Sequence, residues 1–290
     1  MTEEAALHHI DPGAEPIEAE EARVETETDA GFAGLFTLRG KASRRAEVLV
    51  ASAASLAVLL VWEIIVDLGF TNTLFLPAPS AVIATFWRMA ASGDLFVQAG
   101  ISTLRVWSAF LISAAMAIPI GILMSSYRVV GAALEPIVDF IRYLPVPALV
   151  PLSIIWFGVG EETKIFLLWL GTFFQLVLLV ADDMRRVPQE YVETAFTLGA
   201  NQRQVLSDVA FRAMLPNLVD SLRITLGWCW TYLIIAEIVA AQSGIGFVIW
   251  AARRYMHTNE VMAGVFAIGI IGLATDQGLR LLHRRLFRYL

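Results

Sequence analysis

The sequence predicts an all-α polytopic membrane protein with six transmembrane helices, and three observations lead to that prediction. Hydrophobic residues make up 57% and charged residues 17% of the 290 residues, whereas about a quarter of the residues in soluble proteins are charged. The mean hydropathy is +0.66. Six apolar runs reach the roughly 20 residues needed to cross about 30 Å of hydrocarbon. These runs lie near 47–66, 102–124, 132–157, 165–183, 217–241 and 261–281.

The first 38 residues predict a disordered, acidic cytoplasmic tail ahead of a transmembrane domain over residues 39–290. Residues 1–35 contain ten acidic residues against one basic residue, Arg23. A segment with few apolar residues and charges of one sign does not collapse into a core. The acidic start and the late first apolar run are also untypical of a signal peptide.

Prolines mark the irregular spans. The third run contains Pro145, Pro147 and Pro151, each of which removes a backbone donor. We therefore expect the third span to be kinked or broken, and its open backbone to be lined by protein. Pro119 predicts a milder kink in the second span.

Basic residues predict the orientation, because they are enriched on the cytoplasmic side of a membrane. The larger set flanks one side of the spans: Arg39, Lys41, Arg44, Arg45, Arg128, Arg185, Arg186, Arg203, Arg212, Arg280, Arg284, Arg285 and Arg288. The smaller set flanks the other side: Arg88, Arg105, Lys164, Arg253 and Arg254. Both termini are therefore expected in the cytoplasm.

Two stretches on the outer side are too short or too polar to span. One is "LPAPSAVIATFWRMAASGDL", in which Ala81 to Ala91 is amphipathic and Trp87 is suited to an interfacial anchor. The other is "GIGFVIWAARRYMHT". Both are expected to lie along the outer interface.

A polar stretch, "YVETAFTLGANQRQVLSDVAFRAMLP", separates the fourth and fifth spans on the cytoplasmic side. Pro188 suits a helix start, Gly199 suits a break, and Val205 with Val209 puts apolar groups on one helical face. The pattern predicts two short helices forming a knob. Such a knob could fit a groove on a cytoplasmic protein or lie against lipid; its mixed charge favours the protein, because lipid-facing helices are usually basic.

Within this stretch, "ETAFTLGA" followed by "MLP" resembles the EAA motif of ABC-transporter permeases of the binding-protein-dependent importer family. Glu193, Ala195 and Gly199 match the motif, while Thr194 stands where a second Ala is usual. The Leu-Pro pair arrives later than in the family, at Leu215-Pro216.

Further matches in chain order are similar to the nitrate/sulfonate/taurine/bicarbonate subgroup of that family. They are "LPAPS", "PLSIIWFGVGEETKIFL", "AEIVAAQSGIGF" and "IIGLATDQGLRLL". The resemblance covers about residues 60–290.

The resemblance implies a type I ABC importer permease in the inner (plasma) membrane of a bacterial cell. Its implied partners are a second copy of itself, two cytoplasmic ATP-binding subunits and an extracytoplasmic solute-binding protein, with no nucleic acid. ATP and Mg would be bound by the ATPase subunits and no cofactor by this chain, which lacks a G-x-x-x-x-G-K-[ST] loop. Coupling helices are implied over about residues 190–209, with contacts through Tyr191, Glu193, Ala195, Leu198, Gly199, Ala200, Arg203 and Val209.

Charged residues inside the predicted spans should face protein or water. Asp139 with Arg142, and Asp220 with Arg223, are three residues apart and can pair on one helical face; a structural ion pair is the favoured reading of both. Glu237 has no basic residue within a turn, so it needs a partner from another helix or water. It could equally contact the solute or make a buried structural hydrogen bond.

A pathway for a small anion would use cationic or neutral donors and aromatic side chains. The candidates are Arg142, Gln175, Trp228, Trp230, Tyr232 and Glu237. Ordinary packing is the alternative role for the aromatic residues.

Other functions find little support. The single cysteine, Cys229, excludes a disulfide framework, and the four histidines have no metal-binding spacing. The chain is therefore expected to be a non-catalytic subunit that binds no metal. An ATP-independent secondary transporter or channel is the alternative, although no inverted repeat of the kind such folds often carry is evident.

Overall fold

The computed structural model describes residues 43–240 and 242–288. The predicted acidic tail, residues 1–38, lies outside the described residues. The chain divides into two compact units, Met1–Phe70 and Thr71–Leu290, which are considered separately. The described residues form helices and no strand, as the composition predicts.

The first unit contributes one described helix, α2 (Arg44–Asp67). Its start is fixed by Ser43, whose hydroxyl accepts a hydrogen bond from the backbone N–H of Ala46 (3.2 Å), the usual role of an N-cap serine. Its most apolar 18-residue window has no residue buried inside the protein. Such a helix is suited to a surrounding of lipid or of another membrane helix.

The second unit is a bundle whose long helices are α4 (Asp94–Ser126), α7 (Glu161–Arg185), α10 (Phe211–Ala240) and α12 (Thr258–Leu286). Shorter elements are α3 (Pro79–Ala91), α5 (Arg128–Arg142), α6 (Val146–Phe157), α8 (Gln189–Thr197), α9 (Gln202–Gln204), a π-helical segment (Val205–Ala210) and α11 (Ile245–Arg254). Among the described residues, five helices are long and apolar enough to span a membrane, or six if α5 and α6 count as one span. Six spans were predicted.

The third predicted span is broken, as its prolines indicate. Helices α5 and α6 are bent by 99°, and the chain between them runs through Pro145, which is extended. Proline disfavours helical geometry in the residue before it, so Pro145 and Pro147 together stop α5 and restart the chain as α6. Pro119 lies inside the single helix α4; the mild kink expected there stays a prediction.

Close helix packing builds the centre of the second unit, where α7 lies between α4 and α10. A side chain at Gly121 of α4 would come within 2.7 Å of the Val177 carbonyl on α7, and one at Gly171 of α7 within 2.7 Å of the Tyr232 ring on α10. Small residues allow such approaches between membrane helices. The fourth and fifth spans are thereby held against the second.

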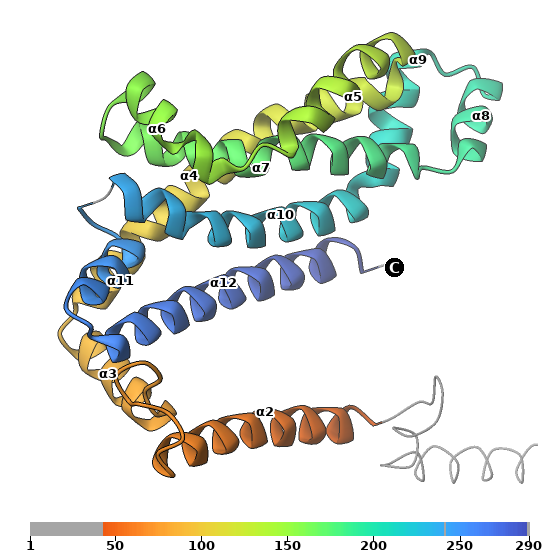
Figure 1. Cartoon of the computed structure of the whole chain (residues 1–290). Helices are drawn as coiled ribbons and strands as arrows, with labels where there is room; N and C mark the ends of the chain where they lie inside the picture. Colours follow the sequence, from red (N-terminus) through yellow and green to blue (C-terminus); the bar gives the residue numbers. More distant parts are fainter. Residues whose placement is uncertain (1–42, 241, 289–290) are drawn as a thin grey trace, which may run out of the picture. The chain divides into compact units, whose positions relative to one another are not determined.

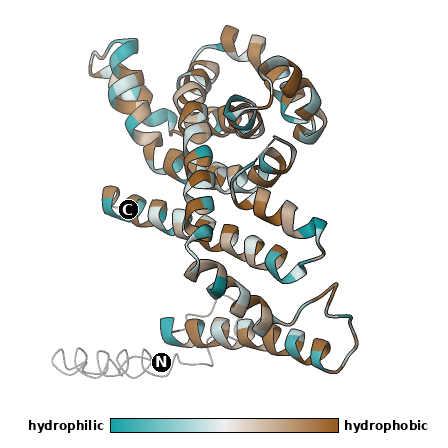
Figure 2. Cartoon of the chain, turned by 90° about the vertical axis from the view of Figure 1, so that its left-hand side faces the viewer, coloured by the Kyte–Doolittle hydropathy of each residue, from teal (hydrophilic) through white to brown (hydrophobic). Residues whose placement is uncertain are grey.

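Two hydrophobic clusters divide the bundle along its length. One includes residues of α11, such as Ile245 and Ile249; the other includes residues next to α8, such as Met184 and Met214. Many large apolar side chains on the helix exteriors stay exposed, and hydrophobic residues cover much of the helices in Figure 2. This distribution fits a bundle that is solvated by lipid.

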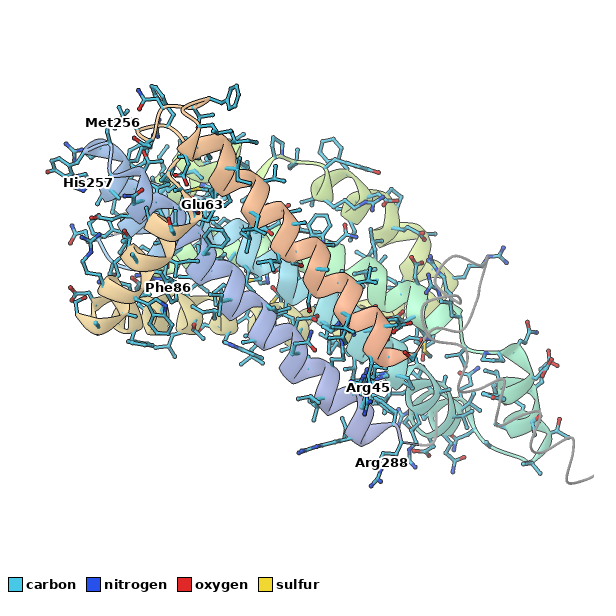
Figure 3. The ribbon with its side chains drawn as sticks, turned by 90° about the horizontal axis from the view of Figure 1, so that it is seen from below. Arg45, Glu63, Phe86, Met256, His257 and Arg288 are labelled. Atoms are coloured by element: carbon cyan, nitrogen blue, oxygen red, sulfur yellow. The ribbon has the colours of Figure 1, made fainter. Side chains whose placement is uncertain are left out.

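The short helices mark the two ends of the second unit. Figure 1 shows α8 at one end and α3 and α11 at the other, where both pack against α12. Helix α12 runs between these ends: Met256 and His257 precede it, and Arg288 follows it at the opposite end in Figure 3. The two stretches expected along the outer interface are thus both helical.

Candidate functional site

The polar segment between α7 and α10 forms a projection, here called the knob (residues 189–210). Its first helix, α8, ends in a Schellman motif: the N–H of Gly199 donates to the Phe196 carbonyl (2.9 Å) and that of Ala200 to the Ala195 carbonyl (3.0 Å). Gly199 has φ +86°, a left-handed backbone conformation that residues other than glycine rarely adopt. The break predicted at Gly199 is confirmed.

The chain starts a new helix at once after this stop. Asn201 and Gln204 form a reciprocal capping box, in which the Asn201 carboxamide accepts from the Gln204 N–H (3.0 Å) and the Gln204 side chain accepts from the Asn201 N–H (2.9 Å). The second helix was expected to be short, but it continues through the π-helical segment into α10 as one helix, Gln202–Ile238. No break follows Val205. Pro216 lies inside this helix and removes one backbone hydrogen bond, a loss that membrane helices tolerate when neighbouring helices or side chains satisfy the freed backbone group.

The knob presents apolar groups to its surroundings. Leu198 at its tip is 82% exposed, and Tyr191 and Phe196 are also exposed. A shallow groove of about 370 Å³ runs along α8 beside Glu193 and Leu198. A second groove of about 330 Å³ lies between α8 and the π-helical segment and includes Val192 and Phe196.

The predicted coupling residues differ in how far they are exposed on the knob. Those that are exposed are Tyr191, Glu193, Leu198, Gly199 and Arg203. Ala195 is buried, and Ala200 and Val209 are half-buried. Glu193 accepts a hydrogen bond from the Gln189 amide (2.6 Å), which holds its carboxylate along the groove.

Four of the six predicted pathway residues come together. Arg142, Gln175, Trp228 and Tyr232 line one cavity of about 40 Å³ between α5, α7 and α10. That volume is enough for a water molecule. Arg142 also pairs with Asp139 (3.1 Å), as predicted.

The other two pathway candidates lie elsewhere. Trp230 is buried and donates from Nε1 to the Thr275 hydroxyl of α12 (3.1 Å). Glu237 is fully buried and takes part in an ionic cluster at the α11 end of the bundle. Its partner comes from another helix, one of the two possibilities that the sequence left open.

Arg105 of α4 is the centre of this cluster, and its side chain is 3% exposed. Its guanidinium binds both carboxylate oxygens of Glu161 (2.6 and 2.7 Å) and one oxygen of Glu237 (2.7 Å). It also donates to the carbonyl and hydroxyl of Ser243 (both 2.8 Å). All five N–H groups of a guanidinium are therefore used.

Glu237 in turn holds the start of α11. Its carboxylate accepts from the Gly246 N–H (2.7 Å) and from the Ser102 hydroxyl (2.8 Å). The Ile245 N–H donates to Ser102 (2.9 Å), and the Gly244 N–H to the Gln98 amide oxygen (2.6 Å). Three backbone donors at the α11 N-terminus are thus satisfied by side chains, which a helix start requires.

The cluster is electrically balanced. Lys164 binds Glu161 (2.7 Å), so two cations face two carboxylates. Sequence reasoning counted Arg105 and Lys164 only as basic residues flanking the spans. The signal that could have found Arg105 is its apolar surroundings, because a charge inside a span needs a partner.

Other charged residues of the bundle pair as predicted. Asp220 binds Arg223 (3.0 Å) three residues later. Arg223 also binds Asp276 of α12 (2.9 Å), a contact that no spacing within α10 could reveal. The part of the chain that the structure describes contains no group of three or more potential metal ligands.

Residues 117–288 match a protein family described as "Binding-protein-dependent transport system inner membrane component". The chain is similar to the taurine transport system permease protein of Escherichia coli (strain K12), at 36% identity over 241 residues that cover 81% of this chain and 88% of that protein. It is also similar to the bicarbonate transport system permease protein of Synechococcus elongatus, at 30% identity over 253 residues that cover 83% and 90%.

The fold is similar to that of a solved transporter. A chain of the MetNI methionine ABC transporter, in inward facing conformations, superposes with a TM-score of 0.52 at 18% identity. The match covers 66% of this chain and 98% of that chain. At this identity the likeness concerns the fold.

Proposed function

The chain belongs to the family of binding-protein-dependent transport system inner membrane components, and we propose that it imports a small anion, such as a sulfonate, bicarbonate or nitrate. It is a permease subunit of an ABC importer, and it is non-catalytic because a partner ATPase hydrolyses ATP. The relatives named for taurine and bicarbonate support the proposed substrate class. Discrimination within that class is assigned to a solute-binding protein.

The knob carries the proposed coupling to the ATPase. Leu198 is 82% exposed at its tip, and burying a leucine contributes about 1.5–3 kcal/mol. Tyr191 and Phe196 add exposed aromatic surface, and such short amphipathic helices bind grooves on partner proteins. A knob joined to α7 on one side and continuous with α10 on the other would transmit the partner's motion to two spans.

The proposed pathway passes the cavity lined by Arg142, Gln175, Trp228 and Tyr232. The side-chain amide and the aromatic N–H and O–H groups are neutral donors, which can replace water around an anion without trapping it. Arg142 adds a cation whose charge Asp139 offsets. We assign Trp230 and Glu237 to the support of this pathway, since both hold neighbouring helices in place.

The proposed assembly has two copies of this chain, two ATPase subunits that bind ATP and Mg, and a solute-binding protein outside. The knob would face the cytoplasm, together with both termini, because the basic residues are concentrated on that side. The end of the bundle formed by α3 and α11 would face outward. The membrane would be the bacterial inner membrane.

The test exchanges Glu193→Arg in the complex of this chain with its cognate ATPase and binding protein. Reversing a charge in the α8 groove should lower uptake about tenfold, the effect of losing one charge-assisted contact of roughly 1.4 kcal/mol. ATP hydrolysis should lose its stimulation by the binding protein. Uptake and ATPase rates are measured in proteoliposomes.

The matched control is Glu47→Arg, the same charge reversal outside the knob. Glu47 is exposed in the first turn of α2, so its exchange should leave uptake nearly unchanged. Normal uptake by the Glu193→Arg complex would refute the proposed role of the knob.

A further inference from the structure

The ionic cluster around Arg105 contains one exposed carboxylate, that of Glu161. The Glu161 side chain is 53% exposed, whereas the side chains of its cationic partners, Arg105 and Lys164, are 3% and 5% exposed. The other carboxylate of the cluster, Glu237, is fully buried. Glu161 is therefore the one charged member of this cluster whose side chain can leave for water without first moving a buried group.

The two carboxylates also differ in what they hold. Glu237 binds Arg105 and in addition accepts from the Gly246 N–H and the Ser102 hydroxyl, so its loss would leave part of the α11 start unsatisfied. The hydrogen bonds of the Glu161 carboxylate run to the two cations, Arg105 and Lys164. Glu237 is thus a fixed partner of Arg105, and Glu161 is a partner that another anion can replace.

The geometry around the Glu161 carboxylate defines the kind of anion that would fit in its place. Nε and Nη2 of Arg105 donate to its two oxygens at 2.6 and 2.7 Å, and Nζ of Lys164 donates to one of them at 2.7 Å. A guanidinium binds in this forked manner to two oxygens carried by a single atom. Carboxylates, sulfonates, bicarbonate and nitrate all have such a pair of oxygens.

The charges of the cluster define the charge of that anion. Without the Glu161 carboxylate, two cations, Arg105 and Lys164, face one carboxylate, Glu237, which leaves a surplus of one positive charge. An unpaired charge in a buried place is unfavourable, so Glu161 should leave only in exchange for another anion. A monoanion restores neutrality, and it would lie at the first turn of α7, where the helix dipole favours negative charge.

We propose that Arg105 and Lys164 form a binding site for a monoanionic oxyanion, which replaces the Glu161 carboxylate on these two cations. The inference rests on the proposed function, which makes a small anion the solute and puts the α11 end of the bundle, opposite α8 (Figure 1), on the outer side. An anion that enters from outside would bind here. Because Glu161 competes for the same donors, binding is weak enough for the anion to move on, as conduction requires.

The experiment follows melting of the full-length chain in nanodiscs as methanesulfonate is added at constant ionic strength, since a bound ligand raises the melting temperature. Glu161→Gln removes the competing charge, while its amide oxygen can still accept from Arg105. The methanesulfonate concentration for half-maximal stabilisation should fall about tenfold. Glu135→Gln is the matched control, because it neutralises the acid of another arginine pair, Glu135–Arg185, and should leave half-saturation unchanged. A purely structural Glu161 predicts a lower melting temperature with unchanged half-saturation.

A second variant changes the site in the opposite direction. Lys164→Gln removes one cation and should raise the half-saturating concentration about tenfold. Dimethyl sulfone, which has sulfonyl oxygens but no charge, should stabilise no variant. Unchanged half-saturation in Glu161→Gln or in Lys164→Gln, or an equal effect of dimethyl sulfone, overturns the anion site. Uptake by the unaltered complex with ATPase and binding protein tests the proposed function separately: shifted half-saturation without uptake of any such anion would support the site and refute that function.

Discussion

Replacing Arg105 with methionine tests whether the buried cluster holds the bundle together. The Arg105 and Glu237 side chains are 3% and 0% exposed, and removal of one partner leaves the other as an uncompensated buried charge. Breaking such a pair costs about 3–5 kcal/mol. At roughly 2–4 °C per kcal/mol for a chain of this size, the melting temperature should fall by about 10 °C.

A double-mutant cycle separates the ion pair from other effects of the substitution. Glu237→Gln removes the charge, but its amide oxygen can still accept from the Gly246 N–H. Arg105→Met in the presence of Glu237→Gln should therefore cost about 2 kcal/mol less than Arg105→Met alone, within the range of coupling between contacting residues. Melting is followed for the purified protein in detergent or nanodiscs.

The control applies the same substitution to an exposed pair. Arg185 binds Glu135 at 2.9 Å, but both side chains are about 40% exposed, so Arg185→Met should cost under about 1 kcal/mol. Equal shifts for Arg105→Met and Arg185→Met would refute the reasoning, because burial would then make no difference. So would a cycle without coupling.

Two glycines give further predictions. A side chain at Gly244 would overlap the Glu237 carboxylate, and its φ is +103°; Gly244→Ala should therefore lower the melting temperature strongly, whereas Gly227→Ala, with nothing within 4 Å, should have little effect. Gly199 has open space around it, so Gly199→Ala should cost only the roughly 1 kcal/mol of its left-handed backbone. That cost should appear as weaker coupling of uptake to ATP hydrolysis rather than as unfolding, and equal coupling in the variant would contradict it.

Local signals predicted much of the fold. Apolar runs located the spans, and Pro145 with Pro147 located the break between α5 and α6. Gly199 located the end of α8, because a Schellman motif favours glycine at one position. The pairs Asp139–Arg142 and Asp220–Arg223 were predictable because three residues put side chains on one helical face.

Contacts between distant segments were not predictable in the same way. Arg105 and Glu237 are 132 residues apart, and no pattern in the sequence near either residue indicates that the other is its partner. Because α4 begins at Asp94, eight residues before the apolar run, Arg105 lies well inside the helix and not at its flank. The continuation of the knob into α10 was missed because a π-helical segment has no clear sequence signal.

The pairing of arginines with acids bears on what crosses the bundle. Five arginines of the described helices stand beside carboxylates: Arg105 beside Glu161 and Glu237, Arg142 beside Asp139, Arg185 beside Glu135 and Asp182, Arg223 beside Asp220 and Asp276, and Arg280 beside Asp276. Opposite charges so close together cancel over distance. An anion crossing the bundle would therefore not be bound strongly at any of these arginines, which favours rapid transport over tight binding.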